Sequence, residues 1–154
     1  MAVRYKESGG EPDKTQRSPR WNNYWLGGKE SNMADMSDGL SKSTLLYACS
    51  GAANTGYLAD QVARLLARQG AGEMTCLVSM GANQQKFLQA ARDAHRNVVI
   101  DGCPIACGKK IFETLGMPFE HFVTTDFGVE KKKTPITEEL ITTVVAAIRN
   151  RLEK

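Results

Sequence analysis

Cys103 and Cys107 lie where a strand passes into a helix, and their spacing suits thiol or metal chemistry. The apolar run 97–100 before them is typical of a buried strand, and residues 109–115 after them favour a helix. If Cys103 caps this helix and Pro104 takes its first position, the two sulfurs lie one helical turn apart on one face. The unpaired N–H groups and macrodipole of a helix N-terminus also stabilise a thiolate. We therefore expect both sulfurs to face one ligand or one reacting partner.

Four apolar segments alternate with helical patterns along the chain. Strands are predicted over residues 44–48, 74–80, 97–100 and 121–125. Asn83 is the expected cap of the second helix, and Thr137 that of the last, whose core stripe is Ile141, Val145, Ile148 and Leu152. Apolar strands that alternate with helices predict a parallel sheet covered on both faces. The expected fold is α/β, a small doubly wound (Rossmann- or flavodoxin-like) domain with four parallel strands in the order 2-1-3-4.

This strand order brings two further cysteines into consideration. Ligands bind such sheets at the carboxyl edge, where the chain reverses direction between strands one and three. Cys49 ends strand one and Cys103 ends strand three, so we expect them to be neighbours, joined by Cys107. Cys76 lies early in the predicted second strand and is expected to be an ordinary buried core cysteine, unless that strand ends early or bends at residues 79–81.

The loop after Cys49 predicts a second kind of site. A cysteine after strand one, a glycine-rich loop and a helix N-terminus form the arrangement that low-molecular-weight tyrosine phosphatases use to hold phosphate. Those enzymes need an arginine six positions after the cysteine, where this chain has Thr55. Phosphate hydrolysis is therefore disfavoured, and weak anion binding by the loop is retained as a hypothesis. Its candidate residues are Ser50, Gly51, Asn54, Thr55 and Gly56, although the glycines alternatively only allow a tight turn.

Composition narrows the class of protein. The 154 residues are 42% hydrophobic and carry a formal net charge of +3, which fits one globular domain and is too small to argue for nucleic acid. The basic cluster 131–133 is expected to be a solvated loop. Because the chain shows neither a membrane span nor a signal peptide, we expect a cytoplasmic protein with no membrane partner, whose cysteines are thiols or metal ligands. Residues 1–40 are polar and aperiodic, which predicts a disordered tail before a domain at 41–154.

Several spaced motifs together resemble the DGC domain family, which is named for the Asp-Gly-Cys triplet found here at 101–103. The matching segments run in order from residues 47–51 through Gly56 and Cys76 to residues 101–104 and Cys107, and the resemblance covers roughly residues 43 to 150. The family is described as zinc-binding, with no function assigned. The resemblance implies a DGC-like zinc site whose ligands match, by position, Cys49, Cys76, Cys103 and Cys107.

Two chemical hypotheses follow for these cysteines. In the first, four thiolates hold zinc in a closed site or three leave a position open, while Cu(I) and iron–sulfur clusters also suit thiolates. In the second, the protein is a thiol redox or sulfur-carrier protein in which Cys103 attacks and Cys107 or Cys49 resolves. Asp101 is expected either to accept hydrogen bonds that orient the Cys103 turn, without binding the metal itself, or to cap the helix. Non-cysteine ligands are not expected from the two histidines, His95 and His121.

Overall fold

Strands and helices alternate through residues 43–153, the part of the chain that the computed structural model describes. The strands are β1 (Thr44–Ala48), β2 (Glu73–Met74), β3 (Arg96–Asp101) and β4 (Glu120–Val123). The helices are α1 (Asn54–Arg68), α2 (Leu77–Gly81), α3 (Gln85–Asp93), α4 (Cys107–Thr114), the 3-10 helix η1 (Thr124–Phe127) and α5 (Glu138–Leu152). The predicted disordered tail over 1–40 lies outside the described residues, so the tail and the domain boundary after it stay predictions.

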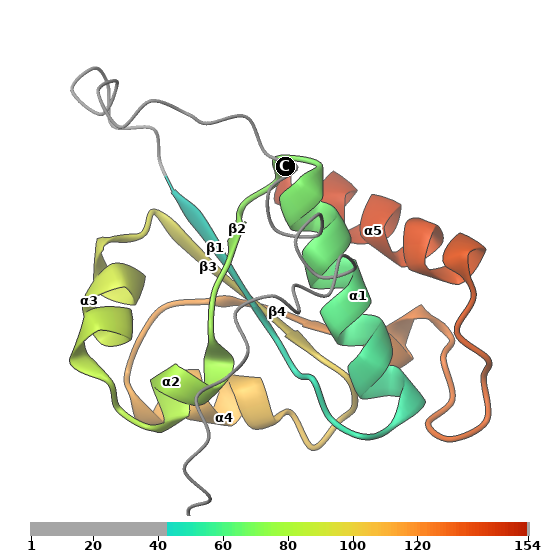
Figure 1. The fold of residues 1–154 in the computed structure, drawn as a ribbon, viewed down its shortest axis with the longest axis horizontal. Coiled ribbons are helices and arrows are strands. Elements are labelled where there is room, and N and C mark those ends of the chain that lie inside the picture. The colour runs from blue at the N-terminus through green and yellow to red at the C-terminus, as the bar shows by residue number, and fades with distance from the viewer. Residues whose placement is uncertain (1–42, 154) are drawn as a thin grey trace, which may run out of the picture. The chain divides into compact units, whose positions relative to one another are not determined.

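All four strands are parallel and lie in the order β2-β1-β3-β4, which confirms the predicted sheet. Figure 1 shows α1 and α5 on one side of this sheet, and α2, α3 and α4 on the other. The central pair, β1 and β3, runs in register from Thr44 opposite Arg96 to Ala48 opposite Ile100. Because β1 and β3 are neighbours in space but not in sequence, the loops that follow them meet at the switch point of the sheet.

Alternate residues of β1 enter two separate hydrophobic clusters. Leu46 and Ala48 pack with α1 and α5, whereas Leu45 and Tyr47 pack with α2, α3 and α4. Burial raises the pKa of Tyr47 to about 12, and its hydroxyl donates to Asn97 Oδ1 over 3.3 Å. A strand covered on both faces needs apolar side chains at nearly every position, which explains the continuous apolar runs in the sequence.

The second strand predicted over residues 74–80 is wrong beyond its first residue. β2 pairs with β1 at only two positions, and the chain then turns into α2. Leu77 and Met80 both pack into the cluster that contains α3 and α4, whereas Val78 is 78% exposed. Positions three residues apart share one face of a helix. A short apolar run such as this one does not distinguish a helix from a strand by itself.

The two predicted helix caps had different outcomes. Helix α3 begins at Gln85 with Gln84 as its cap, so the cap predicted at Asn83 is wrong by one position. Asn83 instead takes a left-handed conformation with φ of 58°, which asparagine tolerates better than most residues. Helix α5 is capped as predicted, because the Thr137 hydroxyl accepts a hydrogen bond from Leu140 N over 3.3 Å.

Helix α5 covers the sheet with the predicted stripe. Val145 and Ile148 are buried, and Ile141 and Leu152 pack at the margin of the same cluster. Val144, which the prediction did not include, is also buried. Within residues 43–153, no helix is long and apolar enough to cross a membrane.

Candidate functional site

The four cysteines all follow the carboxyl end of a strand. Cys49 comes directly after β1, Cys76 follows the two-residue strand β2, Cys103 follows β3, and Cys107 opens α4. All four are free thiols; Cys49 and Cys103 are half-buried, and Cys76 and Cys107 are exposed. Because the strands are parallel, their carboxyl ends meet at one edge of the sheet, so the structure brings the four cysteines to the same edge.

Cys76 differs from its prediction. It is exposed, not buried in the core, because β2 ends two residues before it and α2 begins one residue after it. Hydrogen bonds from the side chain and the backbone N–H of Ser79 lower the pKa of the Cys76 thiol. The early strand end that the sequence left open is therefore what the structure contains.

The four thiols lie at the same edge of the sheet, but they are not gathered around one point. Among residues 43–153, no group of three or more His, Cys, Asp or Glu side chains lies close enough together to hold a metal ion. Zinc binds thiolate sulfur strongly, so the four free thiols fit zinc as a donor set. Their arrangement would have to contract, by movement of the loops that carry them, before three sulfurs reached one ion.

The turn between β3 and α4 also differs from its prediction. Helix α4 begins at Cys107, with Ala106 before it in a left-handed conformation at φ of 52°. Cys103 is therefore not the helix cap but opens a tight turn, in which its carbonyl accepts a hydrogen bond from Ala106 N over 2.9 Å. Only Cys107 lies at the helix N-terminus, and the expectation that both sulfurs share one helical face is wrong.

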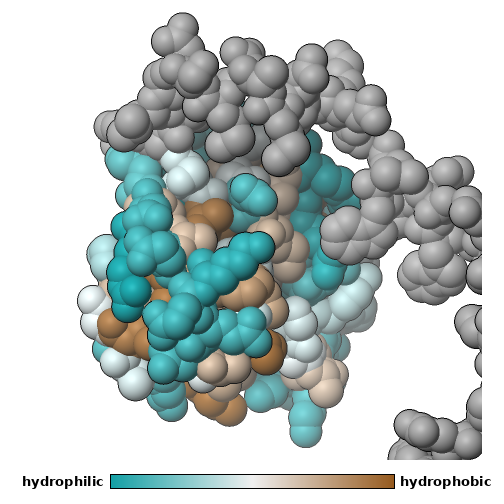
Figure 2. Space-filling model, turned by 60° about the vertical axis from the view of Figure 1, so that its left-hand side comes forward, coloured by the Kyte–Doolittle hydropathy of each residue, from teal (hydrophilic) through white to brown (hydrophobic). Residues whose placement is uncertain are grey.

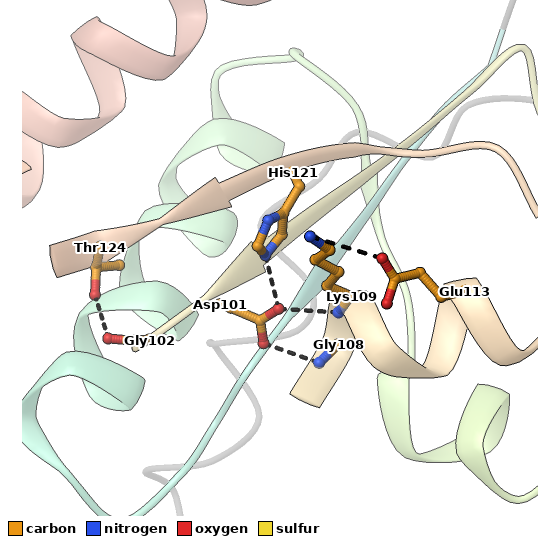
Figure 3. A network of polar contacts seen from close by, with 7 residues as sticks. All are labelled: Asp101, Gly102, Gly108, Lys109, Glu113, His121 and Thr124. Atoms are coloured by element: carbon orange, nitrogen blue, oxygen red, sulfur yellow. Dashed lines mark hydrogen bonds and ion pairs between the residues drawn. The ribbon is translucent and has the colours of Figure 1, made fainter. Parts of the chain in front are cut away.

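Asp101 caps α4 from the end of β3, as one of its two predicted roles required. Its carboxylate accepts hydrogen bonds from Gly108 N over 2.9 Å and from Lys109 N over 3.0 Å (Figure 3). The Asp101 residue is only 1% exposed. A carboxylate at a helix N-terminus satisfies unpaired N–H groups and matches the helix dipole. Its other predicted role, behind a set of metal ligands, stays a prediction.

Gly108 makes this contact sterically feasible. A Cβ atom at position 108 would lie 2.6 Å from Val99 Cγ1 and 3.1 Å from Asp101 Oδ1. The absence of a side chain therefore lets the helix start lie against the strand end.

His121 joins the same network, which the sequence did not indicate. It lies on β4 opposite Val99, and its Nε2 is 2.9 Å from Asp101 Oδ2 (Figure 3). Asp101 thus connects β3, β4 and α4 through one buried carboxylate. The pairing of β3 with β4 decides this contact, because the two residues are 20 positions apart in the chain.

The loop after Cys49 is held tightly, and its anion-binding role stays a prediction. A Cβ atom at Gly56 would lie 2.7 Å from the backbone of Gly51, so Gly56 is required by a close approach of the backbone. Ser50 Oγ donates to Asp60 over 3.1 Å. Thr55 is 1% exposed, and its hydroxyl has no hydrogen-bond partner among the described residues. These contacts favour the structural interpretation of the loop glycines.

Asn54, another of the predicted loop residues, holds a different segment. Its Nδ2 donates to the carbonyls of Glu130 and Thr134 over 3.0 and 2.7 Å, and its Oδ1 accepts from Lys132 N over 2.6 Å. The amide is therefore committed to residues 130–134 and is not free for a ligand.

Lys131 is a second residue whose contact at the site sequence reasoning missed. The cluster 131–133 is exposed, as expected for a solvated loop, but Lys131 Nζ lies 3.6 Å from Cys103 Sγ. The lysine run is the only signal in the sequence, and it does not indicate which lysine meets a cysteine 28 positions away.

A surface groove of about 390 Å³ lies between α2 and α4, and it is lined by Met80, Gly81, Asn83, Lys110, Ile111, Thr114 and Leu115. No cysteine contributes to this lining. Figure 2 shows the side of the molecule on which α3 and α2 lie, where hydrophobic patches are separated by hydrophilic side chains. The groove is therefore distinct from the candidate thiol site.

Comparison with known proteins gives one family and one curated relative. The model of the DGC domain matches residues 45–148. The anaerobic and virulence modulator AnvM of Pseudomonas aeruginosa is 32% identical over 89 residues, which cover 57% of this chain and 68% of that protein. No solved structure matches the chain.

Proposed function

Since this chain belongs to the DGC domain family, whose model spans 45–148, we propose that it binds zinc through cysteine thiolates at the carboxyl edge of its sheet. The observation that carries the proposal is the early end of β2, after which Cys76 follows at the same edge as the other three cysteines. Four free thiols on loops that leave one sheet edge form a donor set of the kind that zinc prefers.

Cys49, Cys103 and Cys107 are the proposed ligands from the switch point, and Cys76 is the proposed fourth. Zinc bound there supplies either a structural cross-link between the loops or, with one position open, a Lewis acid. The exposed residues Pro104 and Ile105, in the turn between Cys103 and Cys107, are the segment expected to move on binding, because no three His, Cys, Asp or Glu side chains of the described chain lie close enough together to hold an ion. We also propose a cytoplasmic location, a compartment in which cysteines are kept reduced and available to a metal.

Zinc content and affinity of the anaerobically purified protein test this proposal. We expect close to one zinc per chain, release of titratable thiols by a chelator, and at least a tenfold loss of affinity on Cys103→Ser and on Cys49→Ser. Cys76→Ser decides between three and four ligands. Thr75→Ser, one position away on the same loop, is the matched control and should bind zinc like the wild type. A reduced protein that binds no zinc at an equimolar concentration would refute the proposal.

A second candidate function, thiol redox or sulfur transfer, is favoured by the contact between Lys131 and Cys103. Lys131 Nζ lies 3.6 Å from Cys103 Sγ, so a hydrogen-bond donor lies beside the sulfur that would attack a disulfide. Cys103 is then the attacking thiol, with Cys107 or Cys49 as the resolving thiol. Under this function, Cys107→Ser and Cys49→Ser differ, because only loss of the resolving thiol accumulates a mixed disulfide on Cys103. Equal behaviour of the two variants toward a disulfide substrate argues against it.

A further inference from the structure

The side chains of Cys103 and Lys131 lie in contact, and this pair can undergo a reaction that is part of neither proposed function. Within residues 43–153, the only polar contact of Cys103 Sγ is with Lys131 Nζ at 3.6 Å. The neighbouring Lys133 pairs instead with Glu130 Oε2 at 2.8 Å, whereas Lys131 has no carboxylate partner in the described chain. Cys103 is half-buried and Lys131 is exposed, so small oxidants can reach both side chains.

The backbone on the lysine side is fixed in place. Asn54, in the first turn of α1, makes three hydrogen bonds to the loop 130–134, the longest of which is 3.0 Å. Within that loop, Glu130 N donates to Thr134 Oγ1 over 2.9 Å, and the preceding Val129 is 3% exposed in the core. The backbone of Lys131 therefore lies in a turn that these hydrogen bonds hold in place.

The backbone on the cysteine side is fixed by the same turn of α1. A Cβ atom at Gly102 would lie 2.6 Å from Gly56 N, so the residue before Cys103 lies directly against the helix start. Thr124 Oγ1 lies 2.9 Å from the Gly102 carbonyl, as Figure 3 shows, and 3.2 Å from the Thr55 carbonyl. One helix start thus positions both chain segments, and their side chains meet as a consequence of the fold.

We propose that Cys103 and Lys131 form a covalent sulfur–oxygen–nitrogen bridge when the protein meets molecular oxygen. The S–H bond of the thiol, one N–H bond of the neutral amine and the O–O bond break, and an S–O and an O–N bond form. One oxygen atom remains in the bridge, and the other leaves as water with the two hydrogens. Sulfur and nitrogen together lose the four electrons that O₂ gains, so no further reductant or oxidant is needed. The flexible four-carbon stem of the lysine accommodates the closer approach that the bridge requires.

The bridge occupies a sulfur that zinc would use. Oxidation of Cys103 then removes one ligand, and the zinc affinity of the chain falls in oxygen. This consequence rests on the proposed zinc function, whereas formation of the bridge does not. The bridge is also reversible, because two equivalents of a dithiol supply the four electrons that return the thiol and the amine, and the bridging oxygen leaves as water.

The test is mass spectrometry of the full chain, metal-free and fully reduced, after incubation at mildly alkaline pH with and without O₂. We expect a mass gain of one oxygen atom less two hydrogen atoms in O₂ alone, its loss on dithiothreitol treatment, and a cross-linked peptide that joins Cys103 to Lys131. Lys131→Arg keeps the positive charge but removes the primary amine, and should abolish the product. Lys133→Arg is the matched control from the same loop and should form the bridge like the wild type.

Three outcomes of the mass measurement would overturn the proposal. An unchanged mass, a disulfide of Cys103 with another cysteine, or a product that persists in Lys131→Arg each refutes the bridge. Circular dichroism of both variants checks that they fold, which we expect because both positions are exposed. Zinc titration of the same samples under anaerobic conditions separates the two proposals: a bridge without zinc binding refutes only the zinc function, and zinc binding without a bridge refutes only the bridge.

Discussion

Replacement of Asp101 by alanine should destabilise the domain severely, because one buried carboxylate serves three elements. The substitution leaves Gly108 N and Lys109 N without their acceptor and removes the partner of His121. A hydrogen bond to a charged group contributes about 1.5–3 kcal/mol, and loss of a helix cap costs about 1 kcal/mol. Because water can reach Lys109 N but not the buried Gly108 N, we expect a net loss of about 3 kcal/mol.

The assay is urea unfolding followed by circular dichroism, with a thermal melt as a second measurement. For a domain of this size, a loss of about 3 kcal/mol corresponds to a fall in Tm of about 12 °C. Asp101→Asn keeps one carbonyl oxygen but turns an NH₂ group toward an N–H donor, so it should lose about half as much. Asp126→Ala is the control, because Asp126 is exposed in η1 and should change stability by less than about 0.5 kcal/mol.

A double-mutant cycle with His121→Ala isolates the contact between the imidazole and the carboxylate. The two residues are in contact, so their effects should not add, and we expect a coupling of about 1 kcal/mol. A loss below about 1 kcal/mol on Asp101→Ala, with α4 still formed, would refute the assignment of this carboxylate as the cap that connects the two strands to the helix.

Three further predictions follow from other contacts. Because a methyl group at position 102 would lie 2.6 Å from Gly56 N, Gly102→Ala should lower the free energy of unfolding by about 1–3 kcal/mol in urea titrations; an unchanged midpoint contradicts the close approach. Burial raises the pKa of Tyr47 to about 12, so the stability linked to its neutral phenol is complete below pH 10 and is lost between pH 10 and 12, by about 3 kcal/mol. Tyr47→Phe should abolish this loss when the free energy of unfolding is measured between pH 10 and 12. If the free energies of wild type and variant fall in parallel over that range, the raised pKa of Tyr47 is contradicted. Asn54→Ala removes three hydrogen bonds to the loop 130–134 and should cost about 2 kcal/mol and reduce the yield of the bridge between Lys131 and Cys103; an undiminished yield shows that the loop needs no anchor.

The fold was predictable because its signals are local and repeated. Continuous apolar strands such as 97–100 alternate with helical stripes, and few sheet topologies accommodate that alternation. Thr137 was predictable as a cap for the same reason, since a hydroxyl before two glutamates acts within one helical turn. The run 74–80 failed because its apolar residues fit a strand and a short helix equally well, and burial against α3 and α4 selects the helix.

The sequence by itself determined which residue types could do chemistry and at which edge of the sheet they lie. Cys49, Cys103 and Cys107 follow predicted strand ends and specify that edge, because parallel strands all present their carboxyl ends to the same side, whereas the early end of β2 that adds Cys76 came from the structure. Only the tertiary structure decided which side chains meet there. Asp101 contacts His121 because β3 pairs with β4, and Lys131 contacts Cys103 because Asn54 holds a distant loop against the start of α1. Contacts of this kind depend on packing between segments far apart in the chain, and no local spacing of residues encodes them.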